Sequence, residues 1–340
     1  MQRRLFLLSG TASGLAALTG CGGGGGGPAE SAASGTLTVT ESAAAVTPAV
    51  TPAAGAMTGT STDTASALPA KVLACYYTTW DTSRYALTDV PTDFNLIYLF
   101  HSKPNGTPVN GSYNNVGDGS FYFEHHATVT ATQVQACRQR GQRVILTVGG
   151  ASAGFAWDTR TKSRNFVASF QAMYARLGGV DGIDFNNYEA TILNTSNLAA
   201  VTAEMIWIAQ HLRALYGADF AITSPPQPND PNHQSLMAGL ARAGVLSWAA
   251  PQFYDWTGFN ASGYIAGRIN SWVDLVGGDA SRTMVGLSAN YSNGPSLADC
   301  VREWNTVKAA HPAIRGMFCW SAQTNLAGGH GWGSVMKNLL

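Results

Sequence analysis

The sequence has 340 residues, and its 20 basic and 20 acidic side chains give a formal net charge of zero. Charged residues make up 12% of the chain, which is about half of their usual share in globular proteins. With no net charge and no run of lysine and arginine, the composition argues against a nucleic-acid partner and against adsorption to an anionic membrane.

The N-terminal residues predict a targeting segment. The first four residues carry positive charge, and Leu5–Leu18 is a mostly apolar stretch that is too short to span a membrane. The tetrapeptide Leu18–Cys21 resembles the cleavage box of bacterial lipoproteins, in which the cysteine is lipidated. Two adjacent arginines near the start also resemble a twin-arginine export signal. We therefore expect residues 1–20 to be a signal peptide and Cys21 to carry a lipid anchor; an ordinary cleaved signal peptide is the alternative.

Residues 21–68 predict a linker. They consist mainly of Gly, Ala, Ser and Thr, and they include the six-glycine run Gly22–Gly27. Such a segment buries too little apolar surface to offset the entropy of ordering, so we expect it to be disordered. A flexible tether suits an anchored protein. We expect an exported lipoprotein of the cell envelope or cell surface, with release from the cell as a variant, and residues 69–340 as a single monomeric domain.

Strand-like runs recur along residues 69–340. Eight short apolar stretches have the length of buried strands, and several end at glycine, proline or polar residues. They are Lys71–Tyr77, Phe94–Phe100, Arg143–Val148, Val180–Asn186, Phe220–Ser224, Trp248–Tyr254, Met284–Ala289 and Ile314–Trp320.

Helical periodicity separates several of these runs. Ser163–Leu177 and Ser196–Tyr216 carry apolar residues on one face, and Leu297–Ala309 repeats the pattern more weakly. Support for a helix between Trp80 and Asp93 is poor. Eight apolar strands that alternate with helices predict an α/β fold, namely a (β/α)8 TIM barrel. An open doubly wound sheet is the competitor, but no Gly-x-Gly-x-x-Gly turn follows the first strand.

In such a barrel, functional residues lie at the carboxyl ends of the strands. These ends are rich in aromatic, amide and carboxylate side chains, and they lack His and Cys residues at metal-ligand spacing. Aromatic rings stack on sugar faces, and amides and acids bind hydroxyl groups. The pattern predicts a carbohydrate site without a metal or another cofactor. The end residues are Tyr76, Tyr77, His101, Gly149, Gly150, Asp184–Glu189, Gln227, Gln252–Asp255, Asn290, Tyr291, Trp320 and Gln323.

Aromatic residues just past the strand ends have two interpretations. Trp80, Trp157 and Trp256 could form outer sugar subsites or cap the rim of the barrel. His125 and His126 fall in a long polar loop, where we expect them to be solvated.

Four cysteines remain besides the one at the cleavage box. An exported protein can form disulfides, and an even number of cysteines is compatible with two bridges. However, two of the four fall in predicted strands and two in predicted helices, so buried free thiols are the alternative. The residues are Cys75, Cys137, Cys300 and Cys319.

Five segments together resemble the family 18 glycoside hydrolases, the chitinases and endo-β-N-acetylglucosaminidases. They occur in family order and span residues 70–330. They are CYY in the first strand, TVGG in the third, DGIDFNNYE in the fourth, QFYD in the sixth and GMFCWS in the last. The resemblance implies retaining hydrolysis of β-1,4-linked N-acetylglucosamine glycans, in which the substrate's own N-acetyl oxygen attacks the anomeric carbon. Such substrate-assisted enzymes are exceptions to the scheme with two catalytic carboxylates.

The family's fourth-strand motif is Asp-Gly-x-Asp-x-Asp-x-Glu. Asp181, Gly182 and Asp184 match it. Asn186 stands in place of the third aspartate, which orients the acetamido group. Tyr188 stands in place of the glutamate, which protonates the leaving oxygen. A neutral amide can still hold an acetamido group, but it leaves the remaining aspartate without a carboxylate neighbour.

Glu189 falls one position later than the family's acid. Strand side chains alternate, so on a regular strand Asn186 and Tyr188 face the barrel interior and Glu189 points away. A β-bulge at Asn186–Asn187, or an early end of the strand, would turn Glu189 into the cleft. Tyr188 is better suited to lining the cleft than to donating a proton, because its ordinary pKa of about 10 is poorly matched to acid catalysis near neutrality.

These considerations define the candidate site and two functional hypotheses. The candidate catalytic residues are Glu189, Asp184, Asn186 and Tyr254. The candidate substrate-binding residues are Tyr76, Gly149, Gly150, Asp181, Tyr188, Gln252, Asp255 and Trp320. The first hypothesis is a chitinase-like hydrolase, and the second is a catalytically inactive, chitin-binding surface lipoprotein. The choice among chitin, glycoprotein glycan and peptidoglycan, and between endo and exo cleavage, stays open.

Overall fold

The computed structural model of the protein describes residues 67–82, 85–186, 191–192, 195–289 and 294–340. All of these belong to one compact unit, Thr60–Leu340. Within the described ranges, every helix is too short or too polar to cross a membrane.

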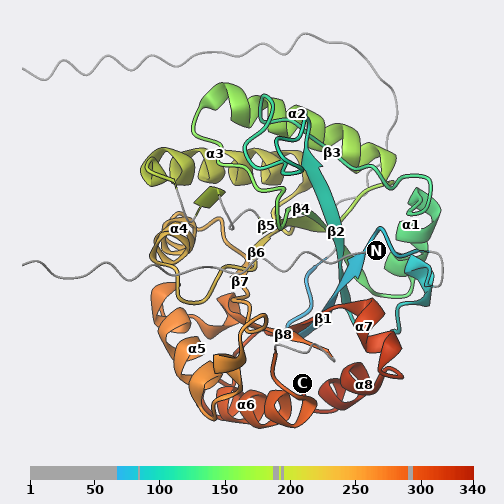
Figure 1. Cartoon of the computed structure of the whole chain (residues 1–340), viewed down its shortest axis with the longest axis vertical. Coiled ribbons are helices and arrows are strands. Elements are labelled where there is room, and N and C mark those ends of the chain that lie inside the picture. Colours follow the sequence, from blue (N-terminus) through green and yellow to red (C-terminus); the bar gives the residue numbers. More distant parts are fainter. Residues whose placement is uncertain (1–66, 83–84, 187–190, 193–194, 290–293) are drawn as a thin grey trace, which may run out of the picture. The chain divides into compact units, whose positions relative to one another are not determined.

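Eight parallel strands form a barrel at the centre of this unit (Figure 1). They are β1 (Val72–Thr78), β2 (Leu96–Pro104), β4 (Arg143–Gly149), β5 (Gly182–Asn186), β6 (Ala221–Ser224), β7 (Trp248–Ala249), β8 (Met284–Ser288) and β9 (Gly316–Trp320). Hydrogen-bonded neighbours follow the order β7-β6-β5-β4-β2-β1-β9-β8. Parallel bridges from Ala249 to Thr283 and from Gln252 to Gly286 close the ring between β7 and β8. The predicted TIM barrel is therefore confirmed.

Helices surround the barrel (Figure 1). They are α1 (Ala131–Gln139), α2 (Arg160–Arg176), α3 (Leu198–Tyr216), α4 (Pro231–Arg242), α5 (Tyr264–Leu275), α6 (Leu297–Ala310), α7 (Ala322–Ala327) and α8 (Gly331–Lys337), with 3-10 turns η1 (Leu87–Asp89), η3 (Thr257–Asn260) and η4 (Ala280–Arg282). Helices α2, α3 and α6 lie where apolar periodicity predicted them. Between β1 and β2 the described residues contain only η1, in keeping with the weak helical signal there.

The predicted strand Trp248–Tyr254 is the one that differs most from the structure. β7 ends at Ala249, although hydrogen bonds to β8 continue beyond it. The N–H of Gly286 donates to the Pro251 carbonyl at 2.9 Å, and the N–H of Phe253 donates to the Gly286 carbonyl at 2.8 Å. Proline lacks an N–H group and cannot continue a regular ladder, which explains the early end of the strand.

The strands separate two apolar regions, and alternate residues of each strand enter one or the other. The inner region fills the barrel and includes Tyr76 of β1, whereas Tyr77 belongs to the outer region between strands and helices. On β5, Ile183 and Phe185 lie in the outer region. Asp184 and Asn186, which alternate with them, therefore face the barrel interior.

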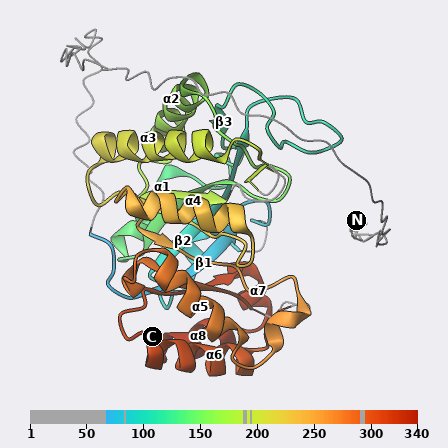
Figure 2. The ribbon, with the colours of Figure 1, turned by 90° about the vertical axis from the view of Figure 1, so that its left-hand side faces the viewer.

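A short strand that the sequence did not predict, β3 (Phe121–Tyr122), pairs antiparallel with the end of β2. Figure 2 shows the loop between them extending away from the helices. This loop is tied to the segment after β4, because the N–H of Tyr113 donates to the Ser152 carbonyl at 2.6 Å. After β3, His125 and His126 are partly buried, not fully solvated as expected.

The four cysteines of the described unit are buried free thiols, so the structure agrees with the second alternative from the sequence. Cys75 of β1 and Cys319 of β9 are direct neighbours in the strand pairing. Burial raises the pKa of both thiols well above the ordinary value. Both therefore stay protonated and behave as small apolar side chains.

Candidate active site

Asp184 lies in the barrel interior, where hydroxyl groups from three other strands donate to its carboxylate. The bonds are Tyr76 OH to Oδ2 at 2.7 Å, Thr147 Oγ1 to Oδ2 at 3.1 Å and Thr223 Oγ1 to Oδ1 at 2.7 Å. Burial raises the pKa of Asp184 to about 6, and the hydroxyl groups oppose this effect by stabilising the charged form. The carboxylate is thus mainly ionised at neutral pH and titrates in mildly acidic solution.

Tyr76 connects this carboxylate to the aromatic lining of the barrel. Its ring stacks on Tyr98 with centroids 4.6 Å apart and meets Phe318 edge-on at 5.0 Å. The phenol of Tyr98 accepts a hydrogen bond from Trp248 Nε1 at 3.0 Å. Burial, together with the nearby charge of Asp184, raises the pKa of Tyr76 well above its ordinary value. Its hydroxyl therefore remains protonated and can keep donating to Asp184.

Asn186 follows Asp184 on the interior face at the end of β5. Its side chain is 3% exposed, and its Oδ1 has no hydrogen-bond partner among the described residues. An unpaired buried amide oxygen costs about 1–3 kcal/mol, and such a group in a folded protein calls for an explanation. A bound ligand or water that donates to Oδ1 would supply the missing partner.

Gly149 and Gly150 hold the end of β4 close to this asparagine. The N–H of Gly150 donates to the backbone carbonyl of Asn186, and the carbonyl of Gly149 bonds to His101 Nδ1. Gly150 has a φ of 118°, and a Cβ there would lie 2.5 Å from the ring of Phe100. Only glycine allows this approach. The two glycines thus shape the mouth beside Asn186 through their backbone.

Tyr254, Gln252 and Trp320 form an aromatic and amide wall at the same mouth. The hydroxyl of Tyr254 donates to Gln252 Oε1, while Gln252 Nε2 donates to the Pro225 carbonyl at 2.6 Å. Trp320 is partly exposed at the end of β9, and its ring is nearly parallel to that of Tyr254 at a centroid distance of 6.4 Å. It also lies 5.5 Å from Tyr76. The predicted residues of the first, sixth and last barrel strands therefore lie together, and Tyr76 connects them to Asp184.

Three site residues were not singled out from the sequence. Thr147 and Thr223 bind Asp184, and each is a polar residue inside an otherwise apolar strand run, which is a signal that could have identified it. Ser288 ends β8 at 1% exposure, pairs in register with Trp320, and has no hydrogen-bond partner for Oγ among the described residues. It offers a second unpaired polar atom at the mouth.

Asp181 does not join this group. It precedes β5, and its carboxylate faces Arg138 of α1, with Nη2 at 3.2 Å from Oδ1 and Nε at 3.3 Å from Oδ2. The N–H of Val144 also donates to it at 2.9 Å. Asp181 is fully buried, and the ion pair lies at the amino end of the strand, away from the mouth. The carboxylate of Asp181 thus joins β5 to α1, and its predicted substrate-binding role stays a prediction.

The aromatic and acidic residues past the strand ends divide into two groups. Trp157 is fully buried, and its Nε1 donates to the Gly119 carbonyl at 3.1 Å, so it belongs to the core and not to a sugar subsite. Trp80 and Trp256 are 55% and 50% exposed, so for them both interpretations stay open. Asp255 is exposed next to Tyr254, with a left-handed φ of 67°.

Tyr188, Glu189 and Cys21 lie outside the described residues, so their predicted roles stay predictions. The pairing between β4 and β5 runs without interruption from Ile145–Gly182 to Gly149–Asn186. The strand is therefore regular as far as Asn186.

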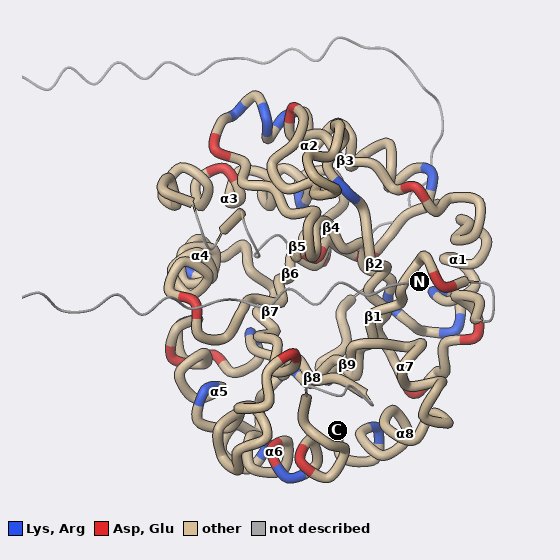
Figure 3. The backbone as a smooth tube through the Cα atoms, viewed as in Figure 1, with Lys and Arg blue, Asp and Glu red and all other residues tan. Residues whose placement is uncertain are grey.

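Charge is sparse near the site. Figure 3 shows the acidic and basic residues mainly on the helices and connecting segments around the barrel. Across the described part of the chain, no group of three His, Cys, Asp or Glu residues is placed to hold a metal ion.

Solved structures with a similar fold include chitinases of family 18 (GH18). A family GH18 chitinase from Chromobacterium violaceum superposes with a TM-score of 0.65 at 17% identity, covering 80% of this chain and 84% of that chain. A family 18 chitinase from Crocus vernus gives 0.66 at 16% identity, covering 78% and 98%. Concanavalin B gives 0.60 at 13% identity, covering 80% and 99%.

The chain is a (β/α)8 barrel whose fold is similar to that of GH18 chitinases. In this chain an asparagine ends β5 and a tryptophan ends β9. No protein-family profile matches the sequence, and no curated relative matches it.

Proposed function

We propose that this protein binds β-1,4-linked N-acetylglucosamine glycans at the carboxyl end of the barrel and hydrolyses them with retention. The observation that carries the proposal is the buried, unpaired Oδ1 of Asn186 beside Asp184. An acetamido group presents an N–H donor that this oxygen can accept. The aromatic rings of Trp320 and Tyr254 suit the apolar face of a sugar. The fold shared with chitinases supports the substrate class.

Each residue would have a distinct part in the reaction. Asn186 would accept the acetamido N–H and so turn the acetamido oxygen toward the anomeric carbon. The buried charge of Asp184 would stabilise the positive charge that develops on the acetamido group. Glu189 would protonate the leaving oxygen and later take a proton from the attacking water. Tyr254, which donates to Gln252, would redirect its hydroxyl to the acetamido oxygen.

A binding function without catalysis is the second candidate. Asn186 cannot exchange a proton with Asp184, whose two oxygens already receive three hydroxyl hydrogen bonds. Asp184 would then hold a ligand through its charge and hydrogen bonds without shuttling a proton.

The two functions are separated by the release of fluorophore from chitooligosaccharide glycosides. We expect turnover by the wild type, a large loss in Glu189→Gln and retained activity in Tyr188→Phe. Unchanged activity in Glu189→Gln would remove Glu189 from the mechanism. Chitin binding by a wild type that shows no turnover would establish the binding protein.

We also propose export and lipid anchoring at Cys21, supported by the sequence Leu18–Cys21. In fractionated cells, the Cys21→Ala variant should be found outside the membrane fraction. Retention of the variant in the membrane would contradict the anchor.

A further inference from the structure

His101 is a titratable residue at the barrel mouth that the proposed function does not use. It follows Phe100 in β2 and is 8% exposed. Its imidazole stacks on the ring of Phe100 at a centroid distance of 4.3 Å and meets the exposed Trp80 edge-on at 6.1 Å. These contacts hold the ring in one orientation.

The hydrogen bonding of His101 determines which ring nitrogen carries the proton. Nδ1 bonds to the carbonyl oxygen of Gly149, and a carbonyl can only accept, so Nδ1 is the donor. In a neutral imidazole, Nε2 is then an acceptor. Nε2 makes no hydrogen bond with the described residues, and it is not closed off from solvent. It therefore reaches solvent with its lone pair free.

The imidazole stays neutral under ordinary conditions. Burial lowers the pKa of His101 to about 4, and the bond to Gly149 opposes this effect only in part. Lys103, Glu124 and His125 are the charged or titratable groups near the ring, and Lys103 pairs with Glu124. Lys103 lowers the pKa of His101 and Glu124 raises it, so burial has the largest effect on that pKa.

We propose that His101 is a ligand-positioning residue whose Nε2 accepts a hydrogen bond from a hydroxyl group of the bound saccharide. The inference rests on the proposed glycan-binding function. Phe100, on which the imidazole stacks, meets Trp320 at 4.8 Å and Tyr76 at 5.7 Å. His101 is therefore one ring away from the aromatic wall beside Asp184. A sugar presents several hydroxyl donors, and a neutral, preoriented acceptor complements them.

A purely structural role would need only Nδ1. The pairing between β2 and β4 shifts register between Leu99 and Ser102, and the bond from His101 to Gly149 spans this gap. Two substitutions separate the roles of the two nitrogens. In His101→Asn the side-chain amide can still donate to Gly149, but no acceptor remains at the position of Nε2. In His101→Gln an acceptor reaches the region of Nε2, but the bond to Gly149 is lost.

The test is a titration of the full chain with tetra-N-acetylchitotetraose, in which tryptophan fluorescence is read immediately after mixing. The Tm of each variant is measured in parallel. We expect His101→Asn to weaken binding about three- to tenfold with an unchanged Tm, as for one neutral hydrogen bond. We expect His101→Gln to bind more tightly than His101→Asn despite a lower Tm.

Three other outcomes would overturn the inference. Wild-type affinity in His101→Asn would assign the residue a structural role alone. A structural role alone would also be shown if the variant with the lower Tm were the weaker binder. A wild type that does not bind the tetrasaccharide would overturn the proposed function together with this inference. In the first two outcomes the wild type binds, so only this inference fails.

Discussion

The carboxylate of Asp184 combines a burial cost with unusually complete hydrogen bonding. Three hydroxyl donors serve its two oxygens, yet burial still raises its pKa to about 6. Asn186 is uncharged, so it cannot share a proton with Asp184 as an aspartate at that position would. The group is a single buried anion whose ionisation works against folding and whose charge is available to a ligand.

Asp184→Asn should change the pH dependence of stability. The pKa of Asp184 rises from 3.8 to about 6 on folding, so between these values the folded protein holds a proton that the unfolded chain has lost. The Asp184 contribution to the free energy of unfolding therefore falls as pH rises through this window, by about 3 kcal/mol in total. Urea denaturation between pH 3.5 and pH 7.5 should show this fall in the difference between the free energies of unfolding of the wild type and the variant. Parallel pH profiles would contradict the raised pKa.

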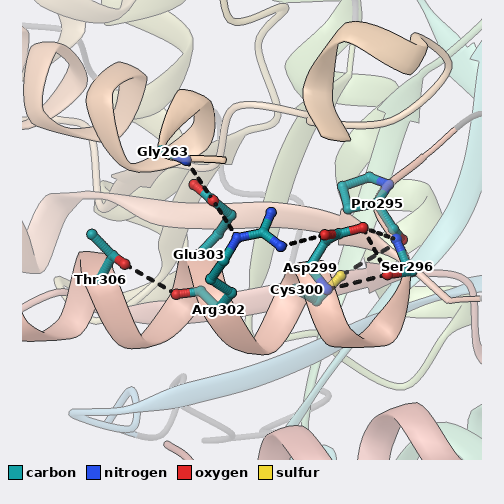
Figure 4. Close-up of polar contacts among 8 residues, drawn as sticks. All are labelled: Gly263, Pro295, Ser296, Asp299, Cys300, Arg302, Glu303 and Thr306. Atoms are coloured by element: carbon teal, nitrogen blue, oxygen red, sulfur yellow. Dashed lines mark hydrogen bonds and ion pairs between the residues drawn. The ribbon is translucent and has the colours of Figure 1, made fainter. Parts of the chain in front are cut away.

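Helices α5 and α6 are joined by a buried glutamate that caps one helix from the other (Figure 4). Glu303 of α6 is 1% exposed and accepts from the N–H groups of Gly263 at 2.8 Å and Ala266 at 3.1 Å. The N-cap of α5 is Gly263 itself, which has no side chain to offer. The carboxylate thus satisfies orphan donors and complements the positive end of the helix dipole.

Glu303→Gln should destabilise the protein by about 2 kcal/mol, because the amide removes the charge and turns an N–H group toward backbone donors. Its neighbour Arg302 provides a matched control. Arg302 contacts Glu303 through Nε at 3.3 Å from the more exposed side of the helix, so Arg302→Gln should change the free energy of unfolding little. Equal effects of the two substitutions in urea denaturation would show that the ion pair, and not the cap, is what matters.

At the scale of the whole molecule, the residues just before β1 tie the first strand to its neighbours. Arg143 of β4 donates to the Ala67 carbonyl through Nε at 3.2 Å, and Arg315 donates to the Pro69 carbonyl at 2.9 Å. Lys71 Nζ donates to the carbonyls of Pro312 and Ile314, each at 2.6 Å. These bonds hold the start of β1 to β4 and to the residues just before β9, the last strand, with which β1 pairs.

Two truncated chains should distinguish the contribution of these hydrogen bonds to stability from that of the residues before Thr60. A chain that begins at Thr60 keeps all of these bonds, so its Tm should equal that of the full chain. A chain that begins at Val72 loses the partners of Arg143 and Arg315 and the side chain of Lys71, so its Tm should fall by several degrees. Calorimetry on both truncated chains checks this expectation. A lower Tm for the chain that begins at Thr60 would mean that residues 1–59 contribute to the stability of the barrel.

The order of the barrel strands follows from the sequence alone, as does the approximate extent of each strand except β7. Strands buried on both faces must be nearly continuous apolar runs, and such runs stand out from their surroundings. The sequence also indicated several residues of the mouth, including Tyr76, Asp184, Asn186 and Trp320, because the carboxyl ends of parallel strands meet at one edge.

Which of these side chains contact one another depends on the tertiary structure. Thr147 and Thr223 reach Asp184 across 37 and 39 residues of sequence, and Arg138 reaches Asp181 across 43. The first two contacts build the site, and the third withdraws an acidic residue from it. The physical reason is that alternation assigns a side chain to a face of its own strand, whereas its partner depends on which strand or helix packs alongside.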